Sequence, residues 1–183
     1  MQKNEVSVLG VSDVRWKGQG EIRSDECTVY HSGGERAEKC VAIVVHKSIE
    51  RCVVKKIVYN DRIIAIKLQA EPINILIMQV YMPTSEHKHE EVEEFYDIIE
   101  KIPEEDGKGN TITIIMGGWN SVVGDKPYRK IVGPHGIGRK KHRGQMLINF
   151  CERSGLIVTT HGSGSLREDC THGRNQKIGV DIS

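Results

Sequence analysis

The sequence predicts an α/β fold built of stacked layers, and three observations support this. Short apolar runs rich in β-branched residues recur along the chain, which is typical of buried strands. Two segments between such runs carry apolar residues at helical spacing instead. The chain has 183 residues, of which 38% are hydrophobic and 28% are charged, so it can bury a core and is not a disordered polymer. We therefore expect a single domain over residues 1–183.

Four strands are expected in the first half of the chain. Residues 6–11 form a short apolar run, and residues 41–45 are apolar without interruption. Residues 62–68 and 73–81 are two further apolar runs. A short turn at residues 70–72 separates these two runs, which predicts a β-hairpin.

Two helices are expected further along. Ser85 is a suitable N-cap for a helix over residues 86–102. The apolar residues of this segment fall on one helical face: Val92, Phe95, Ile98, Ile99 and Ile102. Residues 144–154 form the second predicted helix, which Gly155 ends, and residues 156–159 form the strand after it.

The end of a strand near the middle of the chain is the most informative feature for function. The apolar run at residues 111–116 stops at Gly117 and Gly118, which are followed by Trp119 and Asn120. Polar side chains at strand ends are where α/β proteins commonly hold their chemistry. Asn120 could orient a phosphate or a water, but the two glycines stand where a catalytic strand end usually carries a carboxylate. The sequence therefore indicates a site built for a reaction that the chain no longer performs.

Three more polar groups lie at or near the ends of predicted strands: Asp13, Tyr81 and Asp181. A carboxylate in such a place could bind a hard cation such as Mg²⁺ through oxygen. A phenol and a carboxamide nearby could hold a phosphate oxygen and orient the attacking water. Taken singly, a Tyr or Asn after a strand is more often a structural cap or turn residue than a catalyst.

Seven segments carry a recognisable pattern in a fixed order: residues 8–16, 41–45, 60–62, 79–85, 115–120, 136–138 and 144–151. In this order they resemble the endonuclease/exonuclease/phosphatase superfamily, which includes pancreatic DNase and the apurinic endonucleases. Within it, the chain more closely resembles the endonuclease domain of LINE-type retrotransposons and the craniofacial development protein 2-like proteins. The resemblance covers nearly the whole chain.

This resemblance implies a four-layered α/β/β/α sandwich (DNase-I-like) and Mg²⁺-dependent hydrolysis of DNA phosphodiester bonds. It implies that Asp13 binds the metal, in the place of a family Glu that is one methylene longer. It also implies that Tyr81 contacts the scissile phosphate. Asn120 matches the last residue of a Gly-Asp-x-Asn motif, and Asp181 matches an Asp that orients a catalytic His.

The chain departs from the family pattern at several points. Gly118 stands where the motif has the Asp that activates the attacking water. The family's first catalytic strand and its closing Ser-Asp-His segment are not found, so we expect an incomplete domain, truncated at both ends. Because a missing general base or phosphate-polarising His costs orders of magnitude in rate, we expect hydrolysis to be impaired or lost. The alternatives are a non-catalytic nucleic-acid-binding or interaction remnant of the same fold, and a decayed reading frame without a selected function.

A basic stretch at residues 125–143 is the candidate nucleic-acid-binding segment. It contains one acid and seven basic residues: Lys126, Arg129, Lys130, Arg139, Lys140, Lys141 and Arg143. These cations could neutralise DNA phosphates, although a solvated surface loop is an equal alternative. The formal net charge of +1 argues against capture of nucleic acid by the whole molecule.

The remaining expectations concern partners, compartment and thiols. We expect DNA as the partner, no membrane, no small-molecule cofactor and a monomer, in the nucleus or the cytoplasm. The five cysteines form no Cys-x-x-Cys pair, so free thiols in a reducing compartment are expected.

Overall fold

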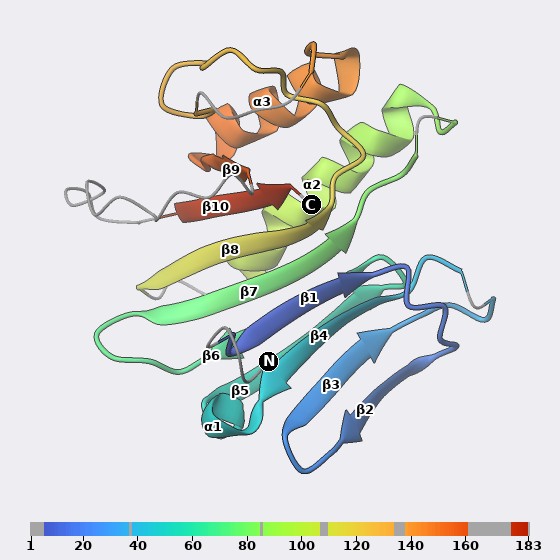
Figure 1. The fold of residues 1–183 in the computed structure, drawn as a ribbon, viewed down its shortest axis with the longest axis vertical. Helices are drawn as coiled ribbons and strands as arrows, with labels where there is room; N and C mark the ends of the chain where they lie inside the picture. The colour runs from blue at the N-terminus through green and yellow to red at the C-terminus, as the bar shows by residue number, and fades with distance from the viewer. Residues whose placement is uncertain are drawn as a thin grey trace. The chain divides into compact units, whose positions relative to one another are not determined.

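The computed structural model describes residues 6–36, 38–84, 86–106, 110–133, 138–160 and 177–182, with the backbone alone for residues 160 and 177–182. In these ranges the chain forms ten strands and three helices (Figure 1). The strands belong to a four-stranded sheet and a six-stranded sheet. None of the helices in the described ranges has the length and apolar character that crossing a bilayer requires.

The chain divides into two compact units. Unit 1 comprises Met1–Tyr81 and Ile115–Gly118, and unit 2 comprises Met82–Ile114 and Trp119–Ser183. Strand β8 (Thr111–Gly118) is shared, because its last residues belong to unit 1 and its first residues to unit 2.

The four-stranded sheet lies in unit 1. Its strands are β1 (Val8–Ser12), β2 (Gln19–Arg23), β3 (Cys27–Ser32) and β4 (Val41–His46), hydrogen-bonded in the order β1-β4-β3-β2. All three pairings are antiparallel. A single helical turn, α1 (Lys47–Glu50), follows β4.

The other strands of unit 1 belong to the six-stranded sheet, whose order is β5-β6-β7-β8-β10-β9. Strands β5 (Val53–Asn60), β6 (Ile63–Leu68) and β7 (Asn74–Tyr81) pair antiparallel, and β6 and β7 pair without a register shift. The turn between β6 and β7 contains a cis peptide bond before Pro72. The hairpin predicted from the two apolar runs is therefore confirmed.

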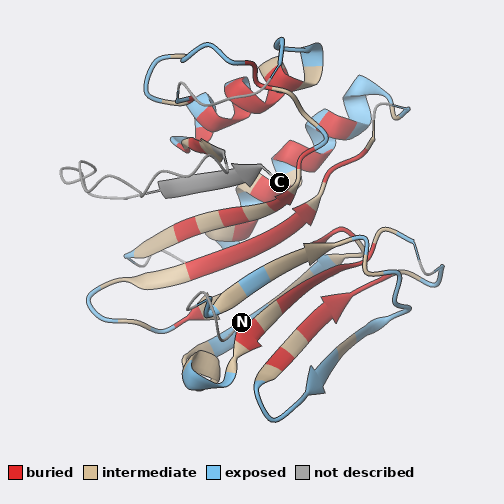
Figure 2. Ribbon diagram, viewed as in Figure 1, coloured by how far each residue is buried: buried red, intermediate tan, exposed pale blue. Residues whose placement is uncertain are grey.

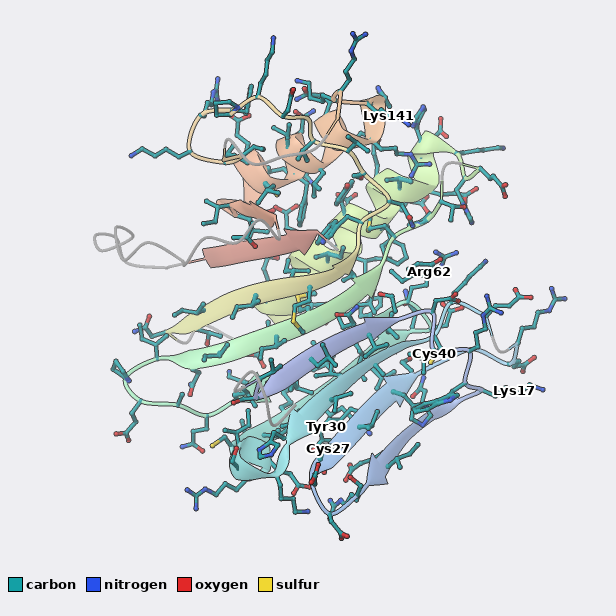
Figure 3. The ribbon with its side chains drawn as sticks, viewed as in Figure 1. Lys17, Cys27, Tyr30, Cys40, Arg62 and Lys141 are labelled. Atoms are coloured by element: carbon teal, nitrogen blue, oxygen red, sulfur yellow. The ribbon has the colours of Figure 1, made fainter. Side chains whose placement is uncertain are left out.

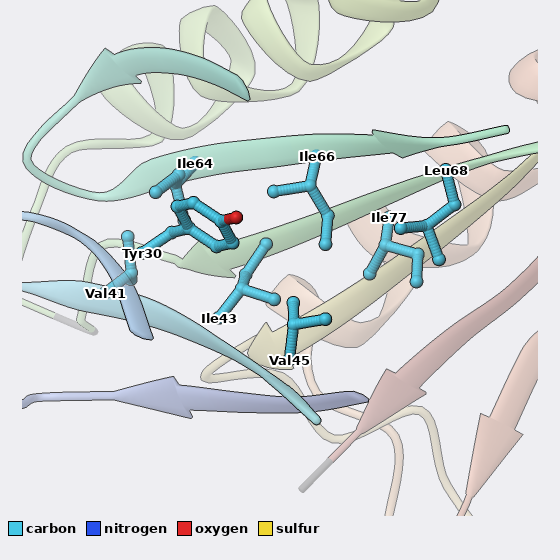
Figure 4. Packing of buried hydrophobic residues seen from close by; sticks show 8 residues of the cluster. All are labelled: Tyr30, Val41, Ile43, Val45, Ile64, Ile66, Leu68 and Ile77. Carbon is cyan, nitrogen blue, oxygen red and sulfur yellow. The ribbon is translucent and has the colours of Figure 1, made fainter. Parts of the chain in front are cut away.

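The core of unit 1 is a cluster of apolar side chains from both of its sheets. Four come from β3 and β4 and four from β6 and β7 (Figure 4): Tyr30, Val41, Ile43, Val45, Ile64, Ile66, Leu68 and Ile77. β-Branched residues dominate this set because they pack well on pleated surfaces. Figure 2 shows buried residues along β3, β4 and β7, and β6 is buried over nearly all of its residues.

Unit 2 contains the two long helices and the last two strands. These are α2 (His89–Glu105), α3 (His142–Ser154), β9 (Val158–Thr160) and β10 (Lys177–Ile182). β9 and β10 pair in parallel. Gly155 ends α3 in the left-handed conformation, as predicted, with φ of 65°.

An aromatic cluster forms the core of unit 2. Trp119 is 1% exposed, and the rings of Tyr96 and Phe150 lie 6.3 Å and 6.2 Å from it. Burial raises the pKa of the Tyr96 phenol, and it raises the pKa of the nearby Cys151 thiol to about 12. Both groups therefore remain neutral and act as packing groups at neutral pH.

The structure corrects several predicted boundaries. Helix α2 begins at His89 with Lys88 as its cap, whereas the predicted cap, Ser85, lies outside the described residues. The helix also continues through Pro103 to Glu105 instead of stopping at residue 102. Strands β2, β3, β5 and β10 were not predicted from the sequence.

Shortening a core side chain tests the packing of unit 1. Ile43 is fully buried between the sheets, so Ile43→Ala removes apolar contacts and leaves a cavity. We expect the free energy of unfolding to fall by about 2–5 kcal/mol in urea denaturation. Val54→Ala, at a side chain that is 53% exposed, is the control and should change the midpoint little. Equal effects of the two substitutions would contradict this packing.

Candidate functional site

Tyr81, the predicted phosphate contact, ends strand β7 in unit 1 and is held there by Arg62. The backbone N–H of Tyr81 donates to the carbonyl of Arg62 at 2.9 Å, and the Arg62 guanidinium donates to the carbonyl of Tyr81 at 3.3 Å. The guanidinium carbon lies 5.6 Å from the centre of the Tyr81 ring, within cation–π range. Arg62, which Figure 3 labels, is buried, with only 7% of its surface exposed. A buried cation therefore fixes the strand end that presents the phenol.

A polar pair, in which Gln79 is buried and Ser12 is half-buried, lies beside this strand end. The side-chain amide of Gln79 donates to the Ser12 hydroxyl at 2.8 Å, and Ser12 donates to the Val80 carbonyl at 3.4 Å. Gln79 is 2% exposed, and its amide oxygen has no hydrogen-bond partner among the described residues. Gly10 makes room for this amide, because a Cβ at Gly10 would overlap the amide oxygen. The pair ties the end of β1 to β7.

The two glycines at the end of β8 have different steric environments. Gly117 has a φ of 148°, and a Cβ there would overlap the carbonyl oxygen of Val80, so glycine is required. A Cβ at Gly118 would lie 3.2 Å from the edge of the Tyr81 ring and 3.8 Å from the Ser12 hydroxyl. A side chain at Gly118 thus needs a shift of only a few tenths of an ångström. It would lie beside the ring of Tyr81.

Asp13, the predicted metal ligand, follows β1 directly in unit 1. It has a left-handed backbone with φ of 60°, a conformation that Asp tolerates better than most residues. Its carboxylate is 47% exposed and pairs with the Arg15 guanidinium at 3.4 Å. An exposed carboxylate beside a cation is accessible to solvent but already partly neutralised.

Asn120 and Asp181 both lie in unit 2. Asn120 also has a left-handed backbone, with φ of 48°, and its exposed side chain donates to the carbonyl of Met82 at 2.7 Å. That bond uses one N–H of the carboxamide and fixes the direction of the group. Asp181 lies in β10 with its backbone in register with Thr159 of β9, and its side chain lies outside the described part of the chain.

The basic stretch is built around a tight turn. Tyr128 and Val132 exchange backbone hydrogen bonds at 3.0 Å and 3.1 Å, and Val158 of β9 donates to the Ile131 carbonyl at 2.7 Å. The turn is therefore attached to a strand. Arg129 and Lys140 each lie within 6 Å of the centre of the Tyr128 ring, at 5.4 Å and 5.7 Å.

Three of the seven predicted DNA-binding cations already have partners within unit 2. Arg129 forms an ion pair with Glu152, and Lys140 donates to the Gln145 side chain at 2.6 Å. Arg143 donates to the carbonyls of Pro83, Thr84 and His87 at 3.4, 3.1 and 2.8 Å.

The other four cations are exposed. These are Lys126, Lys130, Arg139 and Lys141. None of the four has a side-chain partner among the described residues. Figure 3 labels Lys141. The basic stretch therefore contains a structural group and a group that is free to meet a ligand.

The carboxylates in the described ranges do not form a ready metal site. No group of three or more His, Cys, Asp or Glu side chains in those ranges could hold a metal ion together. Asp13 stands as a single acid beside a cation, and Gly118 supplies no second one. One carboxylate with waters and substrate phosphates is the least that Mg²⁺ uses in proteins. Among the described residues, Asp13 is thus the one carboxylate at this strand end that could contribute to binding Mg²⁺, with waters and substrate oxygens as the other ligands.

Comparison with solved structures identifies the class of the fold. The structure is similar to the endonuclease domain of TRAS1, a telomere-specific non-LTR retrotransposon, with a TM-score of 0.54 at 15% sequence identity. The match covers 84% of this chain and 61% of the TRAS1 domain. The chain therefore has an α/β fold of the DNase I-like endonuclease class, which confirms the fold class predicted from the sequence. No family model matches the chain.

Comparison of sequences identifies a particular relative. The chain is homologous to craniofacial development protein 2 of Bos taurus, with 32% identity over 160 residues, which cover 87% of this chain and 27% of the bovine protein. The protein of the same name from Tragulus javanicus is 31% identical over 159 residues, which cover 86% of this chain and 28% of that protein. The chain thus spans about a quarter of the length of these curated relatives.

Removing Arg143 tests whether it has a structural role. Arg143→Ala leaves three backbone carbonyls without their charged donor, and we expect a loss of about 1–3 kcal/mol in the free energy of unfolding. Lys141→Ala, two residues away and exposed, should leave stability almost unchanged. Urea denaturation of both variants measures the difference. If Arg143→Ala were as stable as Lys141→Ala, the three contacts would contribute nothing.

Proposed function

We propose that this chain is a DNA-binding domain of the endonuclease fold whose hydrolytic activity has been lost or strongly reduced at one position. The position is Gly118. A side chain at this position would lie between two polar groups, since Tyr81 and Ser12 both lie within 4 Å of where its Cβ would be. The carboxylate that the family motif places there is missing.

The environment of Gly118 is the observation that favours this proposal over a decayed sequence. Decay would be expected to disturb the supporting contacts as well as the acid. The Arg62 contacts to Tyr81 and the Gln79 contact to Ser12 are nevertheless intact. Asp13 and Asn120 both retain left-handed backbones, a conformation that is uncommon outside glycine and tends to cluster at functional sites.

The rate expected of such a domain follows from the missing acid. General acid–base catalysis contributes about 10²–10⁴-fold, so the loss of the acid alone leaves little turnover. Any remaining cleavage would depend on Mg²⁺ from solution. Asp13 is the carboxylate that we assign to that ion, since it is the only acid described at this strand end. The predicted orienting role of Asp181 remains part of this proposal.

Nucleic-acid binding is the function that the chain retains in this proposal. Backbone phosphates are recognised mainly by Lys and Arg side chains free to reach them. In the basic stretch we assign this contact to the four exposed cations, Lys126, Lys130, Arg139 and Lys141, and assign a supporting role to Arg129, Lys140 and Arg143. Membrane association, a small-molecule cofactor and self-association have no part in the proposal.

Restoring the acid tests the proposed loss of activity. We expect the wild type to nick supercoiled plasmid in Mg²⁺ at background rate, and Gly118→Asp to nick it about 10²-fold faster or more, because the acid is returned beside Tyr81. The measurement is the initial rate of conversion to open circles on agarose gels. Gly118→Asn, which has the same size without the charge, should stay at background.

A second substitution shows whether the restored activity uses this site. Asp13→Asn in the Gly118→Asp background should return nicking to background, and Asn is preferred to Ala because the left-handed backbone suits it. Wild-type nicking that Asp13→Asn abolishes would show that the chain is already active. Unchanged background in Gly118→Asp would show that the missing acid is not the cause of inactivity.

The salt dependence of DNA binding tests the assignment of the four exposed cations. Changing Lys126, Lys130, Arg139 and Lys141 to Gln should weaken binding to a duplex of about 20 base pairs, and the slope of log K against log[salt] should decrease by about 0.9 for each phosphate that is no longer neutralised. Fluorescence anisotropy at several salt concentrations gives this slope. The charge-matched control changes four exposed cations elsewhere in the chain to Gln: Lys17, Arg51, Lys88 and Lys101. Equal slopes for the two variants would rule out the basic stretch as the binding surface.

A further inference from the structure

Two histidines lie next to each other at the starts of the two long helices of unit 2. His89 is the first residue of α2, and His142 is the first residue of α3. The centres of their imidazole rings are 4.4 Å apart, and the ring planes meet at 63°. Both residues are exposed, so a small ligand from solution can reach them.

Contacts further along the helices show that α2 and α3 run in the same direction. Arg153, near the end of α3, donates to the carboxylate of Glu100 at 3.0 Å and to that of Asp97 at 3.4 Å. These contacts lie about as far along α2 and α3 as they are from His89 and His142, so the N-terminal ends of the two helices lie together. The spacing of the two histidines is therefore set by the packing of one helix on the other.

Arg143 holds the two helix starts in place. It follows His142 directly, at the second position of α3. Its guanidinium donates to three carbonyls of the segment that leads into α2, those of Pro83, Thr84 and His87. The backbones that carry the two imidazoles are thus already fixed, and a ligand that binds both rings has little left to order.

The distance between the rings fits one metal ion bound by both. A transition-metal ion such as Zn²⁺ binds an imidazole nitrogen at about 2.0–2.1 Å, which puts each ring centre about 3.2 Å from the ion. Two such rings in adjacent positions of a square-planar or octahedral ion are about 4.5 Å apart, against about 5.2 Å at a tetrahedral ion. The observed 4.4 Å matches the first geometry, which is typical of Cu²⁺ and Ni²⁺. Because both residues are exposed, their rings can turn a nitrogen toward one point without disturbing the core.

The charges around the pair act in opposite senses. Lys88 and Lys141 are the N-caps of the two helices, and helix N-termini are themselves partly positive, so both disfavour a cation. Glu90 and Glu91 lie in the first turn of α2 and favour one. Each such effect at an exposed helix end is worth about two- to fivefold in affinity, and direct bonds to two nitrogen ligands outweigh it. The charge of Arg143 is directed at its three carbonyls.

We propose that His89 and His142 bind one Cu²⁺ or Ni²⁺ ion between them, each through one imidazole nitrogen, with water molecules in the remaining positions. The bound ion joins the starts of α2 and α3. The site uses two protein ligands, which agrees with the absence of any group of three or more metal-binding side chains in the described ranges. It goes beyond the proposed function, because nitrogen ligands select other metals than the carboxylate that we assign to Mg²⁺.

Titration of the full chain with Ni²⁺ tests this site. Ni²⁺ is the probe because thiolates select Zn²⁺ and Cu⁺, and the chain has five cysteines. We expect saturable binding of one ion in isothermal titration calorimetry. His89→Ala and His142→Ala should each weaken it at least tenfold, and the double variant should bind no more weakly than either single variant, because the site needs both rings. His46→Ala, at a half-buried histidine of unit 1 that contacts Ser48, is the control and should leave the affinity unchanged.

Urea denaturation provides a second readout. Saturating Ni²⁺ should raise the unfolding midpoint of the wild type and EDTA should reverse the rise, because an ion that joins two helix starts binds the folded chain better than the unfolded one. Neither single variant should show this rise. The proposal is overturned if Ni²⁺ does not bind saturably, if the double variant keeps the wild-type affinity, or if His46→Ala weakens binding as much as His89→Ala. Losses of the single variants that add up in the double variant, or an unchanged midpoint, would overturn it too, in favour of histidines that act separately.

Discussion

The hydrogen bonds around the end of β7 fix the candidate site of unit 1. Gln79 reaches from this strand to Ser12 at the end of β1, the guanidinium of Arg62 binds the carbonyl of Tyr81, and the carbonyl of Val80 lies so close to Gly117 that only glycine fits. Because β7 is paired along its length with β6 and buried over most of its residues, it provides a rigid base for these contacts. The predicted phosphate contact, Tyr81, is the last residue of β7, and Gly118 lies beside its ring. A shift in the pairing register of β7 would displace all of these contacts at once.

The parts of the fold that were predictable from sequence are those whose local pattern agrees with their final environment. Strands β4, β6 and β7 are apolar because they are buried, and α2 and α3 carry apolar stripes because one side of each is buried. Strand β2 is mostly exposed and polar, so its composition resembles that of a loop, and it was not predicted. Strand β5 was not predicted either, although it is rich in β-branched residues, because Lys55 and Lys56 interrupt its apolar run. Asp13, Tyr81 and Asn120 could be predicted as candidate residues because each stands at or just after the end of an apolar run. The Gln79–Ser12 pair and the contacts of Arg143 were not found, since they join residues 56 to 67 positions apart and leave no local pattern. The different environments of Gly117 and Gly118 also depend on backbone geometry, which the sequence Gly-Gly does not reveal.

In the proposed function, the architecture of the site is separable from the reaction at that site. Supporting contacts such as those of Arg62 and Gln79 stabilise the fold as well as the site, so they would persist even without selection for catalysis. With glycine at position 118, the contacts of Arg62 with Tyr81 and of Gln79 with Ser12 are both present. The same reasoning applies to the basic stretch, where Arg143 supports the backbone and Lys141 is free. Charge alone therefore does not identify which side chains meet a ligand.

Unit 1 is discontinuous, because it needs Ile115–Gly118 as well as the first 81 residues. This has a practical consequence for dividing the protein into fragments. A fragment that ended at Tyr81 would lack the segment of β8 that belongs to this unit, and one long side of β7 would become an open edge. An apolar strand with unpaired N–H and C=O groups is a template for association with other chains. Expression of the first half alone is thus expected to yield aggregates rather than a soluble half-protein, and a workable dissection must keep residue 118 joined to the rest.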